Sequence, residues 1–355
     1  MKKRFHQFII GATPGDAITD QARLLQQWLQ EDGFDSEIYA ESIHPELNHV
    51  IRHYYEYHPS QRNEVVILHH SIGADLVQYL LKQEVHFLLI YHNITPSSFF
   101  QFMDPLLAAQ VRRGRKQLRQ LSKHTLLALA DSPFNEAELR DAGYARTDVL
   151  PIVFDPSRYN LSSNAVLIDR YKDDKFNLLF VGRLTPNKRQ EDLIKLLYCY
   201  RQRINPSTRL LLVGSPWMPA YAEWLRELTE ELDLQDSVIF AGHVSQQDLV
   251  TYYRLADLYI SLSEHEGFGK PLIESMYFEI PIIAYAAAAI PSTLGGTGIL
   301  LRAKHYEAIA ELIEILRLDQ DLRTRIVEGQ RQRLQDFLEP RVHQQWQKLL
   351  TAIQE

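Results

Sequence analysis

Short apolar runs alternate with amphipathic segments of helix length along the whole sequence. Apolar runs bounded by turn residues are typical of strands buried in a parallel sheet, whereas apolar residues three or four positions apart indicate one face of a helix. The expected strands are residues 5–10, 65–68, 87–91, 125–130, 177–181, 210–213, 238–241, 257–262 and 281–285. This alternation predicts an α/β protein whose parallel sheets are covered by helices on both faces.

The length of the chain predicts two domains. At about 150 residues per domain, 355 residues supply two cores. The polar stretch 156–165 is the expected linker, which gives an N-terminal domain of residues 1–165 and a C-terminal domain of residues 166–340. A last amphipathic helix follows, with Val342, Trp346, Leu349 and Leu350 on one face.

The composition is that of a soluble globular protein, with 45% hydrophobic and 23% charged residues. No apolar run approaches the ~20 residues that cross a bilayer, and the run after Arg4 is too short for a signal peptide. The single Cys199 excludes an intrachain disulfide and fits a reducing compartment, so we expect a cytoplasmic protein. The net charge of −7 argues against nucleic acid as a partner.

The segment 264–274 has the strongest chemical signature. An apolar run precedes it, Gly267 and Gly269 form a turn, and Pro271 opens a helix. Backbone N–H groups at such a helix start have no helical partner, and glycine lets an anion approach them closely. The segment therefore predicts an anion site, with a diphosphate as one suitable ligand.

Two carboxylates flank this turn. Glu266 precedes it and Glu274 lies on the new helix, 274 − 266 = 8 positions later. A solvated loop acid and a surface helix residue would also account for them. In the same half, Arg183 and Lys188 lie five positions apart after an apolar strand, and Gly214 follows the next strand. Two unpaired cations repel each other, so they indicate an anionic ligand, although solvated loop charges fit as well.

These residues carry a resemblance. Glu266-x7-Glu274 around Gly-Phe-Gly-Lys-Pro, together with Gly-Arg-x4-Lys at Arg183 and Lys188, resembles the family-4 (group 1) retaining glycosyltransferases. The resemblance implies the GT-B fold, in which two Rossmann-like doubly wound domains face across a cleft. It also implies that the last helix, residues 341–355, packs back on the first domain.

The resemblance further assigns roles to individual residues. Glu266 would contact the donor sugar, Glu274 the ribose hydroxyls, and Arg183 and Lys188 the donor diphosphate. The expected donor-binding residues are Gly15, Arg183, Lys188, Gly214, Glu266, Gly267, Phe268, Gly269 and Glu274. One departure concerns the loop after residue 285, where the family commonly has glycines and an acid, and this chain has Ala287, Ala288 and Ala289.

The N-terminal half contributes histidines at expected strand ends. His92 resembles the family histidine beside the reacting sugar, so we expect it to be catalytic with Glu266, Arg183 and Lys188; a histidine bonded to loop backbone is the alternative. Neighbouring His69 and His70 point to opposite sides of a strand and are not expected to bind one metal ion, and acceptor contact and a structural role are both open for His70. The loop with Gly15 also fits an ordinary strand-to-helix turn.

The expected activity is transfer of a sugar from a UDP- or GDP-linked donor to an acceptor hydroxyl with retained configuration, in polysaccharide, lipopolysaccharide or glycolipid assembly. We expect neither a metal nor a cofactor besides the nucleotide-sugar co-substrate. A glycosidase is less suited, because retaining hydrolases need carboxylates about 5–5.5 Å apart on one bond. A non-catalytic protein that binds sugar nucleotides or polysaccharide is the second alternative, and the alanine-rich loop favours it.

A basic segment predicts a further partner. Residues 111–123 contain six basic and no acidic residues. A solvated helix surface explains them, and so does contact with an anionic membrane surface, where each base contributes on the order of 1 kcal/mol. Such contact would hold the protein at the inner face of the membrane, near a sugar or lipid-linked acceptor. The candidate residues are Arg112, Arg113, Arg115, Lys116 and Arg119.

Overall fold

The structure, a computed structural model, describes residues 4–60 and 64–354. The chain forms two compact units: unit 1 contains Met1–Val153 and Pro340–Glu355, and unit 2 contains Phe154–Glu339. The first division falls after Val153, which is 165 − 153 = 12 residues before the boundary expected from the sequence. The stretch expected as a linker belongs to unit 2, where it contains the 3-10 helix η5 (Pro156–Tyr159) and the first residue of α5.

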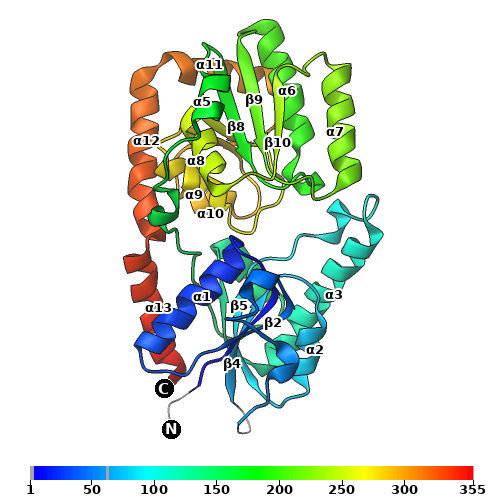
Figure 1. Cartoon of the computed structure of the whole chain (residues 1–355), viewed down its shortest axis with the longest axis vertical. Coiled ribbons are helices and arrows are strands. Elements are labelled where there is room, and N and C mark those ends of the chain that lie inside the picture. The colour runs from blue at the N-terminus through cyan, green and yellow to red at the C-terminus, as the bar shows by residue number, and fades with distance from the viewer. Residues whose placement is uncertain (1–3, 61–63, 355) are drawn as a thin grey trace. The chain divides into compact units, whose positions relative to one another are not determined.

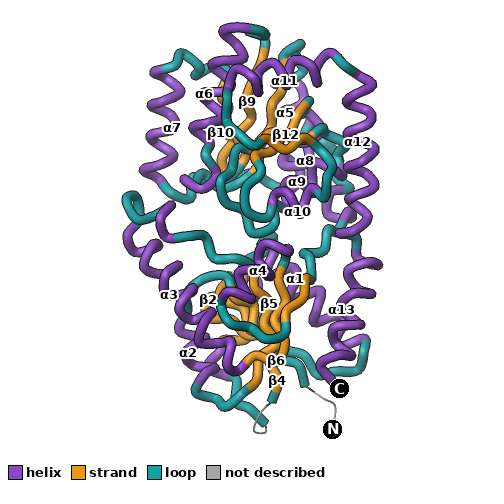
Figure 2. Tube along the Cα trace, turned by 180° about the vertical axis from the view of Figure 1, so that it is seen from behind, coloured by secondary structure: helices purple, strands orange, loops and turns teal. Residues whose placement is uncertain are grey.

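Unit 1 contains a seven-stranded sheet in the order β3-β2-β1-β4-β5-β6-β7, and all of its strand pairs are parallel. Helices cover both faces of this sheet (Figure 2). The strands are β1 (Gln7–Ala12), β2 (Ile38–Ile43), β3 (Arg52–His53), β4 (Val65–His70), β5 (His86–Tyr91), β6 (Thr125–Ala130) and β7 (Thr147–Val149). The helices are α1 (Ala17–Glu31), α2 (Asp75–Leu81), α3 (Pro105–Leu121), α4 (Pro133–Asp141) and α13 (Glu339–Gln354).

Unit 2 contains a six-stranded parallel sheet in the order β10-β9-β8-β11-β12-β13. Its strands are β8 (Phe176–Val181), β9 (Thr208–Val213), β10 (Val238–Gly242), β11 (Leu258–Ser261), β12 (Ile282–Tyr285) and β13 (Ile299–Leu301). Its helices are α5 (Ala165–Tyr171), α6 (Gln190–Arg203), α7 (Pro219–Glu231), α8 (Gln246–Leu255), α9 (Lys270–Tyr277), α10 (Ile290–Leu294), α11 (Tyr306–Leu318) and α12 (Gln320–Leu334).

The α/β prediction with two doubly wound parallel sheets is confirmed. All nine expected strands exist, and β6 has the expected bounds. The sequence analysis missed β2, β3, β7 and β13. Strand β3 has two residues, β7 and β13 have three each, and β2 contains the polar residues Glu41 and Ser42 before its last residue, Ile43. Short edge strands bury too few side chains to leave a pattern.

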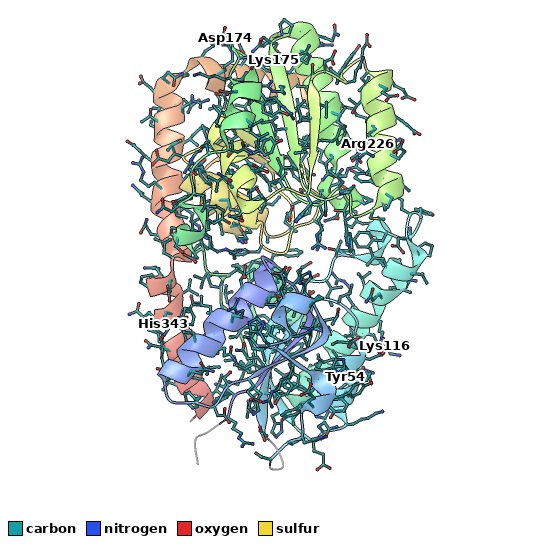
Figure 3. All side chains as sticks on the ribbon, in the orientation of Figure 1. Tyr54, Lys116, Asp174, Lys175, Arg226 and His343 are labelled. Atoms are coloured by element: carbon teal, nitrogen blue, oxygen red, sulfur yellow. The ribbon has the colours of Figure 1, made fainter. Side chains whose placement is uncertain are left out.

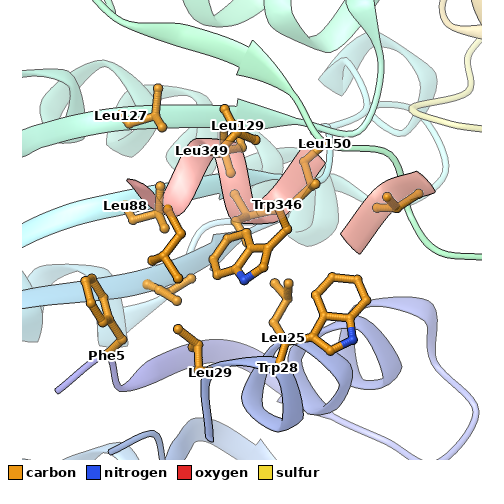
Figure 4. Packing of buried hydrophobic residues seen from close by; sticks show 14 residues of the cluster. Phe5, Leu25, Trp28, Leu29, Leu88, Leu127, Leu129, Leu150, Trp346 and Leu349 are labelled. Atoms are coloured by element: carbon orange, nitrogen blue, oxygen red, sulfur yellow. The ribbon is translucent and has the colours of Figure 1, made fainter. Parts of the chain in front are cut away.

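The core of unit 1 joins the two ends of the chain. Helices α1 and α13 lie side by side (Figure 1), and Trp28 and Trp346 are 1% and 0% exposed within a cluster with Ile67, Leu88 and Leu129 (Figure 4). The imidazole of His343 stacks on Trp28 with ring centroids 4.4 Å apart. A side chain of this size contributes about 3–5 kcal/mol to stability when it is fully buried, so α13 is an integral part of unit 1.

Each sheet has a point where the strand order reverses. In unit 1 the chain proceeds from β1 to β2 on one side and continues with β4 on the other, and in unit 2 the reversal separates β8 from β11. Loops that leave neighbouring strands at such a point diverge and create a crevice at the carboxyl ends, where open α/β sheets bind ligands. None of the helices in the described part of the chain has the length and apolarity that crossing a bilayer requires.

Candidate functional site

The expected donor residues of unit 2 gather at its strand-order reversal. Arg183 and Lys188 follow β8, whereas Glu266 and Glu274 follow β11, and β8 pairs directly with β11. Residues that are about 80 positions apart in the sequence therefore belong to adjacent strand ends (188 and 266 differ by 78). The two motifs identified from the sequence therefore lie beside each other.

The two loops of this site are bonded to each other. The ammonium group of Lys188 pairs with Glu266 Oε2, and the two side chains are 20% and 15% exposed. Beside them, Glu264 N donates to Asn187 O at 2.9 Å and Asn187 Nδ2 donates to His265 O at 3.1 Å. A cation and an anion therefore lie next to one another. Chemically, the ammonium group can bind a phosphate, and the carboxylate can accept a hydrogen bond from a sugar hydroxyl.

Helix α9 begins without a side-chain cap. Gly269 occupies the N-cap position with φ +84°, and no side chain accepts a hydrogen bond from the first turn. This left-handed conformation explains why glycine stands there. Helix α1 differs, because its N-terminus is capped by the carboxylate of Asp16, whereas no side-chain cap is present on α9 among the described residues.

The alanine-rich loop and the helix α10 that follows it are both bonded to this turn. Ala289 N donates to Glu266 O at 3.1 Å, and Thr293 Oγ1 donates to Phe268 O at 2.5 Å. Ala288 adopts a left-handed conformation with φ +49°, which glycine would adopt with less strain. The loop thus positions the carboxylate-bearing segment although its residues depart from those of the family.

Glu274 is held by two tyrosines. Its side chain is 6% exposed, and it accepts hydrogen bonds of 2.5 Å from Tyr159 Oη and from Tyr253 Oη. Burial raises the pKa of Tyr253 well above its usual value, and the charge of Glu274 raises it further, so this hydroxyl stays protonated and donates. The bonds fix the carboxylate, and Lys270 Nζ lies 3.9 Å from its Oε1. A carboxylate oxygen can accept more than one hydrogen bond, so a ligand hydroxyl can still donate to Oε2.

Arg183 lies beside a tryptophan at the ends of β8 and β9. Its guanidinium carbon is 4.9 Å from the ring centroid of Trp217, which is 44% exposed. Gly214 approaches the backbone of Gly182 so closely that a Cβ atom there would lie 2.0 Å from Gly182 O. Only glycine fits at Gly214, and the close contact brings Arg183 and Trp217 together.

His92 belongs to a buried chain of hydrogen bonds in unit 1. Gln7 Nε2 donates to Ala22 O, so its Oε1 accepts from His69 Nε2 at 3.0 Å. His69 Nδ1 lies 2.9 Å from His92 Nε2, and His92 Nδ1 lies 3.0 Å from Asp131 Oδ2. Burial, and then the charge of His92, lower the pKa of His69 well below its usual value, so His69 is neutral.

The direction of the bond between the two histidines follows from Gln7. His69 donates to Gln7 through Nε2, so in the neutral ring Nδ1 accepts from His92 Nε2, and Nδ1 of His92 faces Asp131 Oδ2. Both ring nitrogens of His92 are bonded within unit 1, and a ligand contact by this ring would replace one of those bonds. Asp131 is the partner of His92, while the next residue, Ser132, caps α4.

His70 and Gly15 have local roles in unit 1. His70 points away from His69, as expected, and its Nε2 lies 3.0 Å from Gly114 O. Burial lowers the pKa of His70 to about 4. Gly15 has φ +78° in the turn before α1, where Asp16 Oδ2 accepts from Ile18 N and Thr19 N. The carboxylate of Asp16 already supplies the negative charge that the start of α1 favours.

The basic residues of α3 do not act as one set. Arg112, Lys116 and Arg119 are exposed, and Lys116 is labelled in Figure 3. Arg113 pairs with Asp75 of α2. Arg115 turns inward, where its Nη2 donates to Ile94 O at 2.5 Å and to Glu138 Oε1 at 2.9 Å, so it braces the loop after β5.

The sequence analysis missed several residues that support the candidate site of unit 2. Tyr159, Tyr253, Trp217 and Lys304 lie outside recognisable motifs, and only their side-chain contacts reveal their relation to the site. Within residues 4–60 and 64–354, no group of three or more His, Cys, Asp or Glu side chains is arranged to hold a metal ion.

Two Rossmann-like units, one of which carries a cation pair and two carboxylates at its strand-order reversal, define a protein of the GT-B class. Residues 168–333 match the family model described as "Glycosyl transferases group 1", which covers most of unit 2. The match spans 333 − 168 + 1 = 166 of the 355 residues, so unit 2 is similar to this family.

Curated relatives and solved structures agree with this similarity. The chain is 25% identical over 222 residues to a GDP-mannose-dependent α-(1-6)-phosphatidylinositol monomannoside mannosyltransferase of Mycobacterium tuberculosis, covering 59% of this chain and 57% of that protein. It is 29% identical over 178 residues to the GDP-mannose:cellobiosyl-diphosphopolyprenol α-mannosyltransferase of Xanthomonas campestris, covering 48% and 46%. The chain thus spans about half the length of these relatives.

The fold similarity extends over the whole chain. Sucrose-phosphate synthase of Thermosynechococcus elongatus superposes with a TM-score of 0.75 at 18% identity, covering 99% of both chains. Anabaena HepE in complex with UDP and glucose superposes with a TM-score of 0.73 at 19% identity, covering 99% of this chain and 100% of that one.

Proposed function

We propose that this protein is a retaining, metal-independent glycosyltransferase that moves a sugar from a nucleotide-diphosphate donor to an acceptor hydroxyl. The observation that carries this proposal is the placement of Arg183, Lys188, Glu266 and Glu274 after the paired strands β8 and β11, with Lys188 bonded to Glu266 and α9 starting without a side-chain cap. Two cations and a helix start suit a diphosphate, and two carboxylates suit sugar and ribose hydroxyls.

The chemistry proceeds without an enzymic base. The bond between the anomeric carbon and the diphosphate oxygen breaks, the acceptor oxygen bonds to the same face of that carbon, and the acceptor proton passes to the departing diphosphate. Arg183, Lys188 and the amides of Gly267 to Gly269 stabilise the charge that builds on the leaving group. Removing one such group typically costs about 10²–10³ in rate.

Donor turnover tests the proposal. Purified protein is incubated with UDP-glucose, UDP-N-acetylglucosamine or GDP-mannose, and released UDP or GDP is measured with and without acceptor extracts. We expect one donor to be consumed in the presence of EDTA and Lys188→Gln and Glu266→Gln to lower the rate at least 100-fold. Glu279→Gln is the matched control, because Glu279 forms an exposed pair with Arg331 elsewhere in unit 2.

Two outcomes would contradict the proposal. Donor binding without turnover would favour a non-catalytic sugar-nucleotide protein. A product whose anomeric configuration is inverted, as read from its proton coupling constant, would exclude the retaining mechanism.

We further propose that the acceptor is lipid-linked and that α3 contacts the membrane surface. Both mannosyltransferase relatives act, by name, on a phosphatidylinositol mannoside or a diphosphopolyprenol sugar. Phe102 in the turn before α3 is 90% exposed and Leu106 in its first turn is 84% exposed, and the exposed bases Arg112 and Lys116 follow on the helix. Apolar side chains next to bases suit the boundary between acyl chains and anionic headgroups.

Vesicle co-sedimentation tests this contact. We expect binding to vesicles with one third phosphatidylglycerol and not to pure phosphatidylcholine, and loss of binding in Phe102→Ser/Leu106→Ser and in Arg112→Gln/Lys116→Gln. Val166→Ser is the control, because Val166 is an exposed apolar residue of unit 2 at 68% exposure. Equal binding by all variants would refute the contact.

A further inference from the structure

A lysine outside the family motifs joins several strand ends of unit 2. Lys304 follows β13, and its Nζ donates to Asp192 Oδ2 at 2.8 Å and to Glu264 Oε1 at 2.9 Å. The same ammonium group lies 4.8 Å from the ring centroid of Tyr285 at the end of β12. Asp192 stands in the first turn of α6 after β8, and Glu264 follows β11. One ammonium group therefore ties together segments that follow four strands.

The surrounding charges form a closed cluster. Arg189 Nε lies 3.3 Å from both Asp192 Oδ2 and Glu264 Oε1, and its Nη1 lies 3.0 Å from Glu191 Oε1. With Lys304, these groups comprise two cations and three carboxylates, and Lys304 is only 15% exposed. The carboxylates outnumber the cations, so the cluster does not suit a phosphate. Its cations instead neutralise carboxylates of the same unit.

The cluster adjoins both halves of the candidate donor site. Arg189 immediately follows Lys188, and Glu264 lies two residues before Glu266. Arg189 adopts a left-handed conformation with φ +55°, which an arginine retains only where its surroundings hold it. The hydrogen bond from Glu264 N to Asn187 O also restrains the backbone of the loop after β8.

We propose that Lys304 is a positioning residue of the donor site: it sets the spacing between the loop that carries Lys188 and the loop that carries Glu266. The inference rests on the proposed function for its effect on catalysis. Without Lys304, the carboxylates of Asp192 and Glu264 face each other with Arg189 as their common cation. Their repulsion then moves the two loops apart and separates the groups that bind diphosphate and sugar.

The electrostatics of Asp192 agree with this role. Burial raises the pKa of Asp192, but the hydrogen bond and charge of Lys304, followed by Tyr306 and Arg189, outweigh burial and hold the pKa below its usual value. Asp192 is therefore ionised at neutral pH and needs a cation beside it.

The test begins with the ligand-free protein. Lys304→Met removes the ammonium group and keeps the aliphatic chain over Tyr285, and hydrogen exchange is followed by mass spectrometry. We expect faster exchange in residues 183–189 and 262–269 and unchanged exchange in unit 1. Unchanged exchange in both loops would overturn the proposal, whether or not the protein transfers sugar. This readout therefore separates failure of the inference from failure of the proposed function.

Kinetics then measure the effect on the donor. We expect Lys304→Met to raise the donor KM at least tenfold with little change in the acceptor KM, and Lys304→Arg to recover most of the loss. Lowering the pH from 8 to 5.5 should improve donor affinity in Lys304→Met, because protonating one carboxylate relieves the repulsion. The double variant Asp192→Asn/Lys304→Met should recover affinity at all these pH values.

Controls decide between positioning and general destabilisation. Arg331→Met removes an exposed cation that pairs with Glu279, so it should leave the donor KM unchanged. If Lys304→Met lowers thermal stability and kcat while the donor KM stays within twofold of wild type at every pH, the residue is only structural and the proposal is overturned.

Discussion

The hydroxyl of Tyr253 offers a sharp test of how Glu274 is held. Tyr253 is 0% exposed, and its Oη donates to Glu274 Oε2 at 2.5 Å. Tyr253→Phe removes this hydroxyl and retains the ring, which stacks on Phe278 with centroids 5.0 Å apart and planes 4° apart. The substitution therefore changes one hydrogen bond and almost no apolar packing.

The magnitude follows from the charge and burial of the acceptor. A hydrogen bond to a charged group contributes about 1.5–3 kcal/mol, and the carboxylate left behind is buried away from water. We expect the free energy of unfolding of unit 2 to fall by about 2 kcal/mol. Unit 2 has 339 − 154 + 1 = 186 residues, so its melting temperature should fall by about 4–8 °C.

Urea unfolding followed by far-UV circular dichroism measures this loss, and Tyr198→Phe on the surface of α6 is the control. Tyr198 is 39% exposed, so its substitution should change stability by less than about 0.5 kcal/mol. In a double-mutant cycle with Glu274→Gln, the two substitutions should couple by about 1–3 kcal/mol. A loss no larger than that of the control, with no coupling, would refute the assigned bond.

Three further predictions concern unit 1. Gly114→Ala should destabilise it by about 1–3 kcal/mol in urea unfolding, because the added Cβ would lie 2.6 Å from Gly73 N, and unchanged stability would refute that close approach. Trp346→Ala should cost about 3–5 kcal/mol, measured the same way, whereas a loss below 1 kcal/mol would mean that α13 contributes little to the core. His70 should make unfolding pH-dependent: its folded pKa of about 4 lies below the unfolded value of 6.5, so the stability it contributes is complete above pH 6.5 and is lost as the pH falls toward 4. Over that interval the loss is about 3 kcal/mol, and His70→Gln should flatten the profile; an equally steep profile in the variant would contradict the assignment.

The sequence predicts the fold well where strands are long and central. Strands β4, β5 and β8 bury nearly all their residues, and each contains at least four consecutive apolar residues. The short strands β3 and β13 bury little, and the helical start at Pro156 is polar enough to resemble a linker. Local composition cannot distinguish such segments from loops, because their order comes from neighbours that are distant in the sequence.

The candidate site also contains residues that the sequence predicts and residues that it does not. Arg183, Lys188 and Glu266 follow strands within dense motifs, and the order of strands brings them to one edge of the sheet. The groups that support them, such as Tyr253 and Lys304, are ordinary residues of a helix and a loop whose roles depend on side-chain contacts 21 and 40 positions away. Periodicity and motif spacing carry no information about such contacts.

The packing of α13 in unit 1 has a consequence for synthesis on the ribosome. Residues up to Val153 emerge first, yet the hydrophobic surface that Trp346 covers stays open until nearly two hundred further residues have been translated (346 − 153 = 193). Unit 2 is contiguous and can complete its own core in that interval, so it should reach its native state before the unit that precedes it. The nascent first half therefore exposes apolar surface for the longest period, and it is the part of the chain that would most need a chaperone.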